Sequence, residues 1–207
     1  MRGFLLGVFS GLLSACAIAL LVGLVLIRQG RGFSTRDQPT AMERWVAQEA
    51  RDLAMPAEAK SRTNPIPDNP ETLAEAQAHW ADHCFSCHGN DGSGDTALGK
   101  HLYPPAPDMR LPATQRLTDG ELFYIIQNGI RMTGMPAWGS GSNHDGEDSW
   151  KLVCFIRHLP QVTLEEKRAM EKMNPKSPDE LREEEEEEKF LKGEDSHEAT
   201  PEHHHHH

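Results

Sequence analysis

The sequence predicts an all-α fold with one compact domain, one membrane-spanning helix and a charged tail. An uncharged run of 25 residues stands near the N-terminus, apolar residues recur at helical spacing after it, and several segments begin with a capping signal. No βαβ pattern surrounds the cysteines. We therefore divide the chain into an anchor (1–29), a spacer with a juxtamembrane helix (30–70), the compact domain (71–162) and an acidic helical tail (163–207).

The uncharged run extends from Gly3 to Ile27. As a helix it spans about 37 Å, which exceeds the hydrocarbon core of about 30 Å. The apolar region of a cleavable signal peptide is only about 7–15 residues long, so we expect a retained anchor. Leu13-Ser14-Ala15-Cys16 also resembles a bacterial lipobox, in which Cys16 would be lipidated. The chain stays apolar after Cys16, which favours the anchor, and both alternatives predict an exported, membrane-tethered protein.

The net charge is −11, from 21 basic and 32 acidic residues. Nucleic acid is excluded as a partner, because its phosphates would be repelled. A protein with a basic docking face is the natural complement. The run Glu183–Glu188 is typical of a solvated helix or a disordered tail.

Start and stop signals place the helices. Pro56 ends the juxtamembrane helix, which has a narrow apolar face and is expected to lie on the domain or the bilayer. Prolines 65, 67 and 70 mark a domain boundary. Four segments begin with a capping box, a Ser or Thr followed three residues later by Glu: Thr40 with Glu43, Thr118 with Glu121, Thr163 with Glu166 and Ser177 with Glu180.

Two further helices bound the compact domain. The first carries Ala76, Trp80 and Cys84 four residues apart, and the last has an apolar face that includes Trp150 and Cys154. Small and aromatic residues at matched spacing predict that the two helices cross closely. Cys154 is expected to be a small core residue.

Cys84-Phe85-Ser86-Cys87-His88 is the chemically informative motif. A zinc site would need two more ligands at suitable spacing, and a thioredoxin-like dithiol would need a βαβ unit. Cys-x-x-Cys-His is typical of covalent haem attachment: each thiol adds to one haem vinyl group, and the next residue projects its imidazole at the iron.

Residues 71–162 resemble a class I, monohaem c-type cytochrome. The resemblance rests on "CFSCHG", the following "DGSG", "YPPAPD", "NGIRMTGMPAWG" and the terminal helix "SWKLVCFIRHL". It implies a small all-α haem domain with one covalently attached haem c, held by Cys84 and Cys87 and ligated axially by His88 and Met135. Ala76 stands where this family usually has glycine.

Other residues near this domain carry weaker expectations. Met132 is expected to pack in the core, and Met109 is a poorer ligand candidate still. The family pattern places a carbonyl of Pro104 or Pro105 at the N–H of His88. Trp138 and Arg131 are candidates for hydrogen bonds to the haem propionates, with a packing Trp and a surface Arg as equal alternatives. His79 and His83 are spaced for metal binding but are expected to form a solvated face, and His101, His144 and His158 are expected at the surface.

With both axial positions filled, the expected function is one-electron transfer rather than catalysis. Haem attachment outside the cytoplasmic membrane places the domain in the periplasm, on a single-pass inner-membrane protein that acts as a shuttle or as a subunit of a redox complex. Two alternatives stay open: a haem-based gas or redox sensor, and a metal-handling protein that uses its terminal histidines. That run is a tag, an inert tail or a loose divalent-metal site at His203, His204, His205, His206 and His207.

Overall fold

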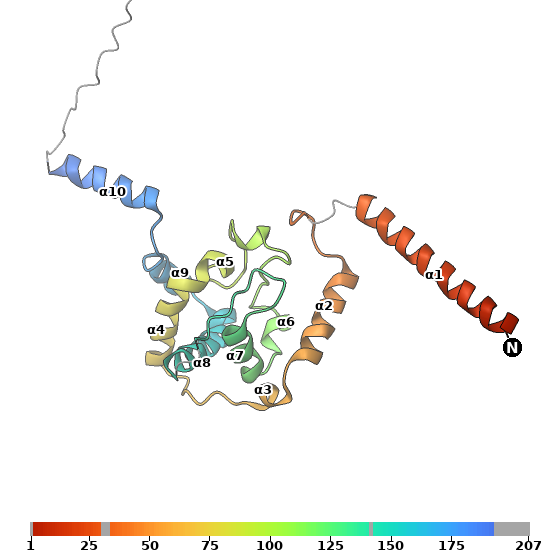
Figure 1. Cartoon of the computed structure of the whole chain (residues 1–207). Helices are drawn as coiled ribbons and strands as arrows, with labels where there is room; N and C mark the ends of the chain where they lie inside the picture. The colour runs from red at the N-terminus through yellow and green to blue at the C-terminus, as the bar shows by residue number, and fades with distance from the viewer. Residues whose placement is uncertain (1, 30–33, 141–142, 193–207) are drawn as a thin grey trace, which may run out of the picture.

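A computed structural model describes residues 2–29, 34–140 and 143–192, and every regular element among them is helical. The all-α class expected from the sequence is therefore confirmed for these residues. The elements in chain order (Figure 1) are α1 (Arg2–Gln29), α2 (Ala41–Ala54), α3 (Ala57–Ser61), α4 (Pro70–His79), η1 (Trp80–Cys84), α5 (Phe85–His88), η2 (Gly99–His101), α6 (Pro112–Gln115), α7 (Asp119–Asn128), α8 (Asn143–His158), η3 (Leu159–Gln161), α9 (Leu164–Glu171) and α10 (Pro178–Leu191).

The N-terminal helix α1 is long and apolar enough to cross a membrane between Gly7 and Val25. None of that stretch is buried against the rest of the chain, and Figure 1 shows α1 extending away from the other helices. Its side chains therefore need an apolar environment from outside the chain, as a membrane anchor would have.

The predicted capping boxes form. In α2 the hydroxyl of Thr40 accepts from the N–H of Glu43 (3.2 Å), and the carboxylate of Glu43 accepts from the N–H of Thr40 (2.7 Å). The same reciprocal pair opens α7, α9 and α10. Helix α4 begins instead with Asn69, whose side chain accepts from the N–H of Thr72. Each cap satisfies backbone N–H groups that a helix start leaves free.

The core lies where α4 and α8 cross (Figure 1). Ala76 of α4 is only 1% exposed, so its methyl group is accommodated among the packed core side chains. Trp80 packs edge-on against Phe155 of α8, with ring centroids 5.2 Å apart. Burial of each such side chain stabilises the fold by about 1.5–3 kcal/mol. The crossing expected from the matched spacing is confirmed, and Cys154 is buried beside it as expected.

The segment that precedes α4 also packs on the domain. Helix α3 approaches α7 so closely that a Cβ at Gly120 would lie 1.9 Å from the carbonyl oxygen of Ala59. Asn64 donates from Nδ2 to the carbonyl of Trp150 (2.9 Å) and to Sγ of Cys154 (3.2 Å). Part of the predicted spacer thus contacts α7 and α8, while the boundary at residue 70 stays a prediction.

Helix α9 also packs against the domain. Met170 is fully buried, and Lys167 Nζ lies 3.2 Å from Asp91 Oδ2. His158 Nε2 lies 2.8 Å from Glu166 Oε1. His158 is half-buried, so its expected surface position is wrong, because α9 folds back over it.

Helix α10 carries the acidic run and has no buried residue. The whole of Glu183–Glu188 is helical and exposed, which is the first of the two alternatives expected for it. Lys176 reaches Glu184 at 2.5 Å and offsets part of the local negative charge. The terminal histidines, His203–His207, lie outside the described residues.

Candidate functional site

The helix that carries the cysteines changes geometry just before them. Helix α4 passes into a π-helical turn, η1, which ends at Cys84, and α5 then carries Cys87 and His88. Single π-helical turns inside helices are frequent at functional sites. The Nε1 of Trp80 donates to the carbonyl of Gly89 (2.9 Å), which closes the segment around His88. Both cysteines and the histidine are therefore held on one turn that is fixed to the core.

Cys84 and Cys87 are both free and half-buried. Burial, with a smaller contribution from the neighbouring Cys87 thiol, raises the pKa of Cys84 to about 12. The Cys84 thiol therefore stays protonated at neutral pH, and it lacks the features of a redox-active thiolate. This argues against Cys84 as the reactive thiolate of a dithiol redox pair.

His88 lacks the partner that the family pattern suggests. Its Nδ1 is buried and makes no hydrogen bond with any described residue, so the expected bond to a carbonyl of Pro104 or Pro105 is absent. Burial lowers the pKa of His88, which keeps the ring neutral at pH 7. A neutral imidazole is the form that binds a metal ion. Its buried, unpartnered nitrogen marks His88 as the group here whose bonding is incomplete.

The turn that carries Cys84, Cys87 and His88 is called the attachment turn below. The glycine-rich loop after His88 packs tightly over it. The hydroxyl of Thr96 donates to the carbonyl of Ser86 (2.7 Å), and the N–H of Gly94 donates to the carbonyl of His88 (2.8 Å). A Cβ at Gly99 would lie 2.2 Å from the carbonyl oxygen of Cys87. Only glycine permits this approach, so Gly99 has a steric role beside the site.

The loop that follows α7 carries Met135, the second proposed iron ligand. Gly129 ends α7 with a φ of 64°, and the carbonyl of Met135 accepts from the N–H of Ile130 (3.1 Å). The N–H of Met135 donates to the hydroxyl of Thr133 (3.1 Å). The N–H of Trp138 then donates to the carbonyl of Ile126 in α7 (3.0 Å). These bonds hold the half-buried Met135 at the centre of an ordered loop.

Met132 occupies a different position from the one expected. It is 93% exposed and has a φ of 61°, whereas the sequence placed it in the core. The turn between α7 and Met135 directs this side chain outward. Met109, by contrast, packs against the core cluster. Met135 is half-buried on its own loop, and its role as an iron ligand stays a prediction.

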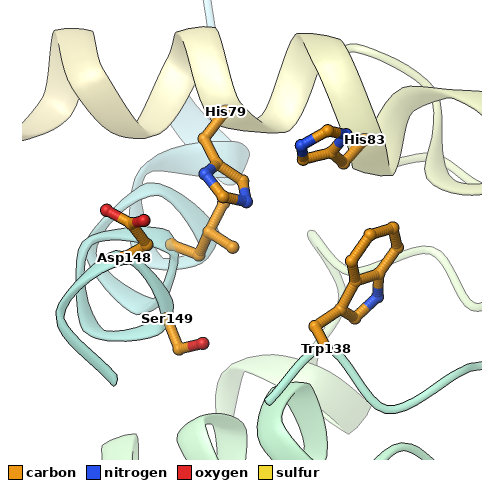
Figure 2. Close-up of a pocket in the computed structure, with 6 residues that line it drawn as sticks. His79, His83, Trp138, Asp148 and Ser149 are labelled. Carbon is orange, nitrogen blue, oxygen red and sulfur yellow. The ribbon is translucent and has the colours of Figure 1, made fainter. Parts of the chain in front are cut away.

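A contact between two rings joins the attachment turn to the Met135 loop (Figure 2). His83, directly before Cys84, stacks on Trp138, with ring centroids 5.5 Å apart and planes 24° apart. Beside this stack lies a crevice of about 190 Å³, lined by His79, His83, Trp138, Asp148, Ser149 and Leu152.

The crevice changes the interpretation of two histidines. His79 is half-buried in it, and burial, more than the neighbouring charges, lowers its pKa. The expectation that His79 and His83 form a solvated face is therefore wrong for His79. No local sequence signal shows this, because Trp138 and Asp148 come from distant parts of the chain.

The residues present fit a covalently bound haem. Two free thiols and a neutral imidazole lie on one turn, and a thioether lies on a separate, ordered loop joined to it by a ring stack. A zinc site fits less well, since the described residues contain no group of three His, Cys, Asp or Glu placed to hold a metal ion.

A comparison with known families agrees with this geometry. The family model described as "Cytochrome C oxidase, cbb3-type, subunit III" matches residues 71–156, which include the cysteine motif, the Met135 loop and most of α8. No curated protein matches the chain. Together with the all-helical fold and the single N-terminal apolar helix, this match shows that residues 71–156 form a domain of the c-type cytochrome family.

Proposed function

We propose that this protein transfers electrons through one haem c, attached covalently to Cys84 and Cys87 and ligated axially by His88 and Met135. The observation that carries the proposal is the half-buried imidazole of His88 on the turn that also bears two free thiols. When bound, haem iron supplies a one-electron couple between its ferric and ferrous forms.

The chain's own residues would determine what that iron can do. His88 and Met135 would both bind the iron of a bound haem, which would leave no iron site for oxygen or a substrate. A thioether ligand favours the ferrous state and so raises the potential. The thiols prevent loss of the group from an exported protein. The core crossing of α4 and α8 holds the attachment turn in place.

We further propose that α1 anchors the protein in the cytoplasmic membrane with the domain on the periplasmic side, where haem attachment takes place. The juxtamembrane helix α2 suits this arrangement. Its apolar residues are between 51% and 85% exposed, while Glu43, on another side of the helix, accepts a hydrogen bond from Tyr103 of the domain (3.2 Å). The exposed apolar residues are Met42, Trp45, Val46 and Leu53.

The partner we propose is a membrane or periplasmic redox protein with a basic docking face. The net charge of −11 supports such a partner, and the name of the matched family suggests an oxidase complex. The tether would confine the domain near the membrane and raise its effective concentration for partners there.

The test is spectroscopic. The protein is exported in a host that attaches haem, and oxidised, reduced and carbon-monoxide-treated spectra are recorded for wild type and Met135→Ala. The proposal predicts that the wild-type haem is low-spin and does not bind carbon monoxide, whereas the haem of the Met135→Ala variant binds it. Met132→Ala is the matched control and should behave as wild type, because its side chain is almost fully exposed.

Two results would contradict the proposal. If no haem is attached, or if Cys84→Ser retains the normal covalent haem, the roles of the two cysteines are wrong. If wild type binds carbon monoxide readily, Met135 does not occupy the sixth coordination position of the iron. A haem-based sensor would then replace electron transfer as the proposed function.

A further inference from the structure

The crevice beside the His83–Trp138 stack has the features of a metal site whose ligands differ from the four residues proposed to hold the haem. His79 and His83 stand four residues apart across the junction of α4 and η1, a spacing that lets two imidazoles share one ion. Their ring centroids are 4.9 Å apart. In Figure 2 a nitrogen of each ring faces the space between the two rings.

The ring separation suits chelation. A divalent ion binds imidazole nitrogen at about 2.0–2.1 Å and so lies about 3.2 Å from the ring centroid. Two imidazoles bound at an angle of about 90–110°, the range from square-planar to tetrahedral, then have centroids about 4.5–5.2 Å apart. The separation of 4.9 Å lies inside this range, so both rings can bind one ion after small rotations of the side chains.

The surroundings favour a cation. Asp82 lies 3.3 Å from His83 Nε2, and Asp148 lines the crevice from α8. One basic side chain of α8 is close: Lys151 Nζ lies 2.7 Å from Glu75, 2.9 Å from Glu147 and 3.8 Å from Asp148 Oδ1, so its charge is shared among three carboxylates. The crevice of about 190 Å³ also leaves room for water.

We propose that His79 and His83 form a two-histidine site for a divalent transition-metal ion, with Cu²⁺ bound more tightly than Ni²⁺ or Zn²⁺. The described residues contain no third His, Cys, Asp or Glu already placed to coordinate with them, so water completes the coordination sphere. Asp148 and Asp82 supply negative charge around it. The site does not depend on the proposed haem ligands or on the terminal histidines.

The experiment uses the haem-loaded chain, with its anchor in detergent, ended at Glu202 so that the terminal histidines cannot compete. Cu²⁺ is titrated and followed by electron paramagnetic resonance, and Ni²⁺, which does not oxidise thiols, is titrated by calorimetry. The variants are His79→Gln and His83→Phe. The phenylalanine keeps a ring against Trp138 and removes only the ligand. His101→Gln is the control, because His101 is exposed and lies outside the crevice.

We expect one equivalent of Cu²⁺ with couplings to two nitrogens in the parent chain. Each crevice variant should bind roughly a hundredfold more weakly, since the second imidazole acts at high effective concentration. His101→Gln should bind as the parent does. Equal affinity in His83→Phe and the parent, or an equal loss in His101→Gln, would overturn the proposal. Haem absorbance, recorded in parallel, separates this result from a failure of haem attachment.

Discussion

The imidazole of His83 stacks on the indole of Trp138, with ring centroids 5.5 Å apart and planes 24° apart. The contact joins the turn that carries Cys84 to the loop that contains Met135, two segments far apart in the sequence. The Met135 loop is also held by hydrogen bonds to α7 and within itself, and the Leu102 side chain lies against Gly134.

Removal of the Trp138 ring should therefore loosen the Met135 loop. For Trp138→Ala we expect carbon monoxide to reach the ferrous iron, and unfolding to be easier by about 1–3 kcal/mol, because a ring stack and its apolar contacts are lost. Trp138→Phe preserves a ring at this position and should recover most of both properties. Gas binding by difference spectra and urea unfolding would measure them, and an unchanged Trp138→Ala would show that the backbone bonds alone hold Met135.

The loop over the attachment turn should not tolerate a side chain at Gly99. A Cβ there would lie 2.2 Å from the carbonyl oxygen of Cys87, so Gly99→Ala should destabilise the fold by about 1–3 kcal/mol and lower the yield of attached haem. Gly146 is the matched control. It lies in α8, where an added Cβ would meet nothing within 4 Å, so Gly146→Ala should be neutral or stabilise by about 0.5–1 kcal/mol. Urea unfolding of both variants tests the contrast.

Asp91 should contribute to stability at neutral pH and not in acid. Partial burial opposes its ionisation, but hydrogen bonds from Ser93 and the ion pair with Lys167 outweigh burial and lower its pKa from 3.8 to about 2. A carboxyl whose pKa is lower in the folded state stabilises the protein above its unfolded pKa. That contribution, about 2 kcal/mol, is lost as the pH falls from about 4 to about 2.

Asp91→Asn should accordingly unfold more easily than wild type at pH 7, and the difference should shrink towards zero near pH 2. Asp95→Asn provides the control, because Asp95 pairs with Lys100 (2.7 Å) where both side chains are exposed. An exposed pair contributes only about 0–1 kcal/mol. Urea unfolding at several pH values gives the comparison, and a difference for Asp91→Asn that does not vary with pH would contradict this account.

The apolar face of α2 should lie at the bilayer surface. In the protein reconstituted in nanodiscs, we expect the backbone amides of residues 41–54 to exchange hydrogen slowly, because the exposed apolar residues enter the interface. Changing Val46 and Leu53 to Glu should accelerate exchange, while Gln48→Glu, on the polar face, should not. Mass spectrometry of the peptides would report this, and fast exchange in the unchanged protein would place α2 in water.

Features that depend on a few neighbouring residues were predictable. The capping boxes at Thr40 and Thr118 need only a hydroxyl and a glutamate one turn apart, so each formed as expected. The apolar length of α1 and the Cys84–His88 motif are also contained in short runs of sequence. The crossing of α4 and α8 could be predicted because small and aromatic residues repeat at helical spacing on both.

Features that depend on distant residues were decided only by the tertiary structure. The crevice at His79 needs Trp138 and Asp148, and the half-burial of His158 needs Glu166 on a helix that folds back. Met132 and Met135 are three residues apart, and the closed loop turns the first to solvent and holds the second half-buried. Sequence spacing specifies which residues share a helix face, whereas the path of the connecting loops determines which faces meet, and no short pattern encodes that path.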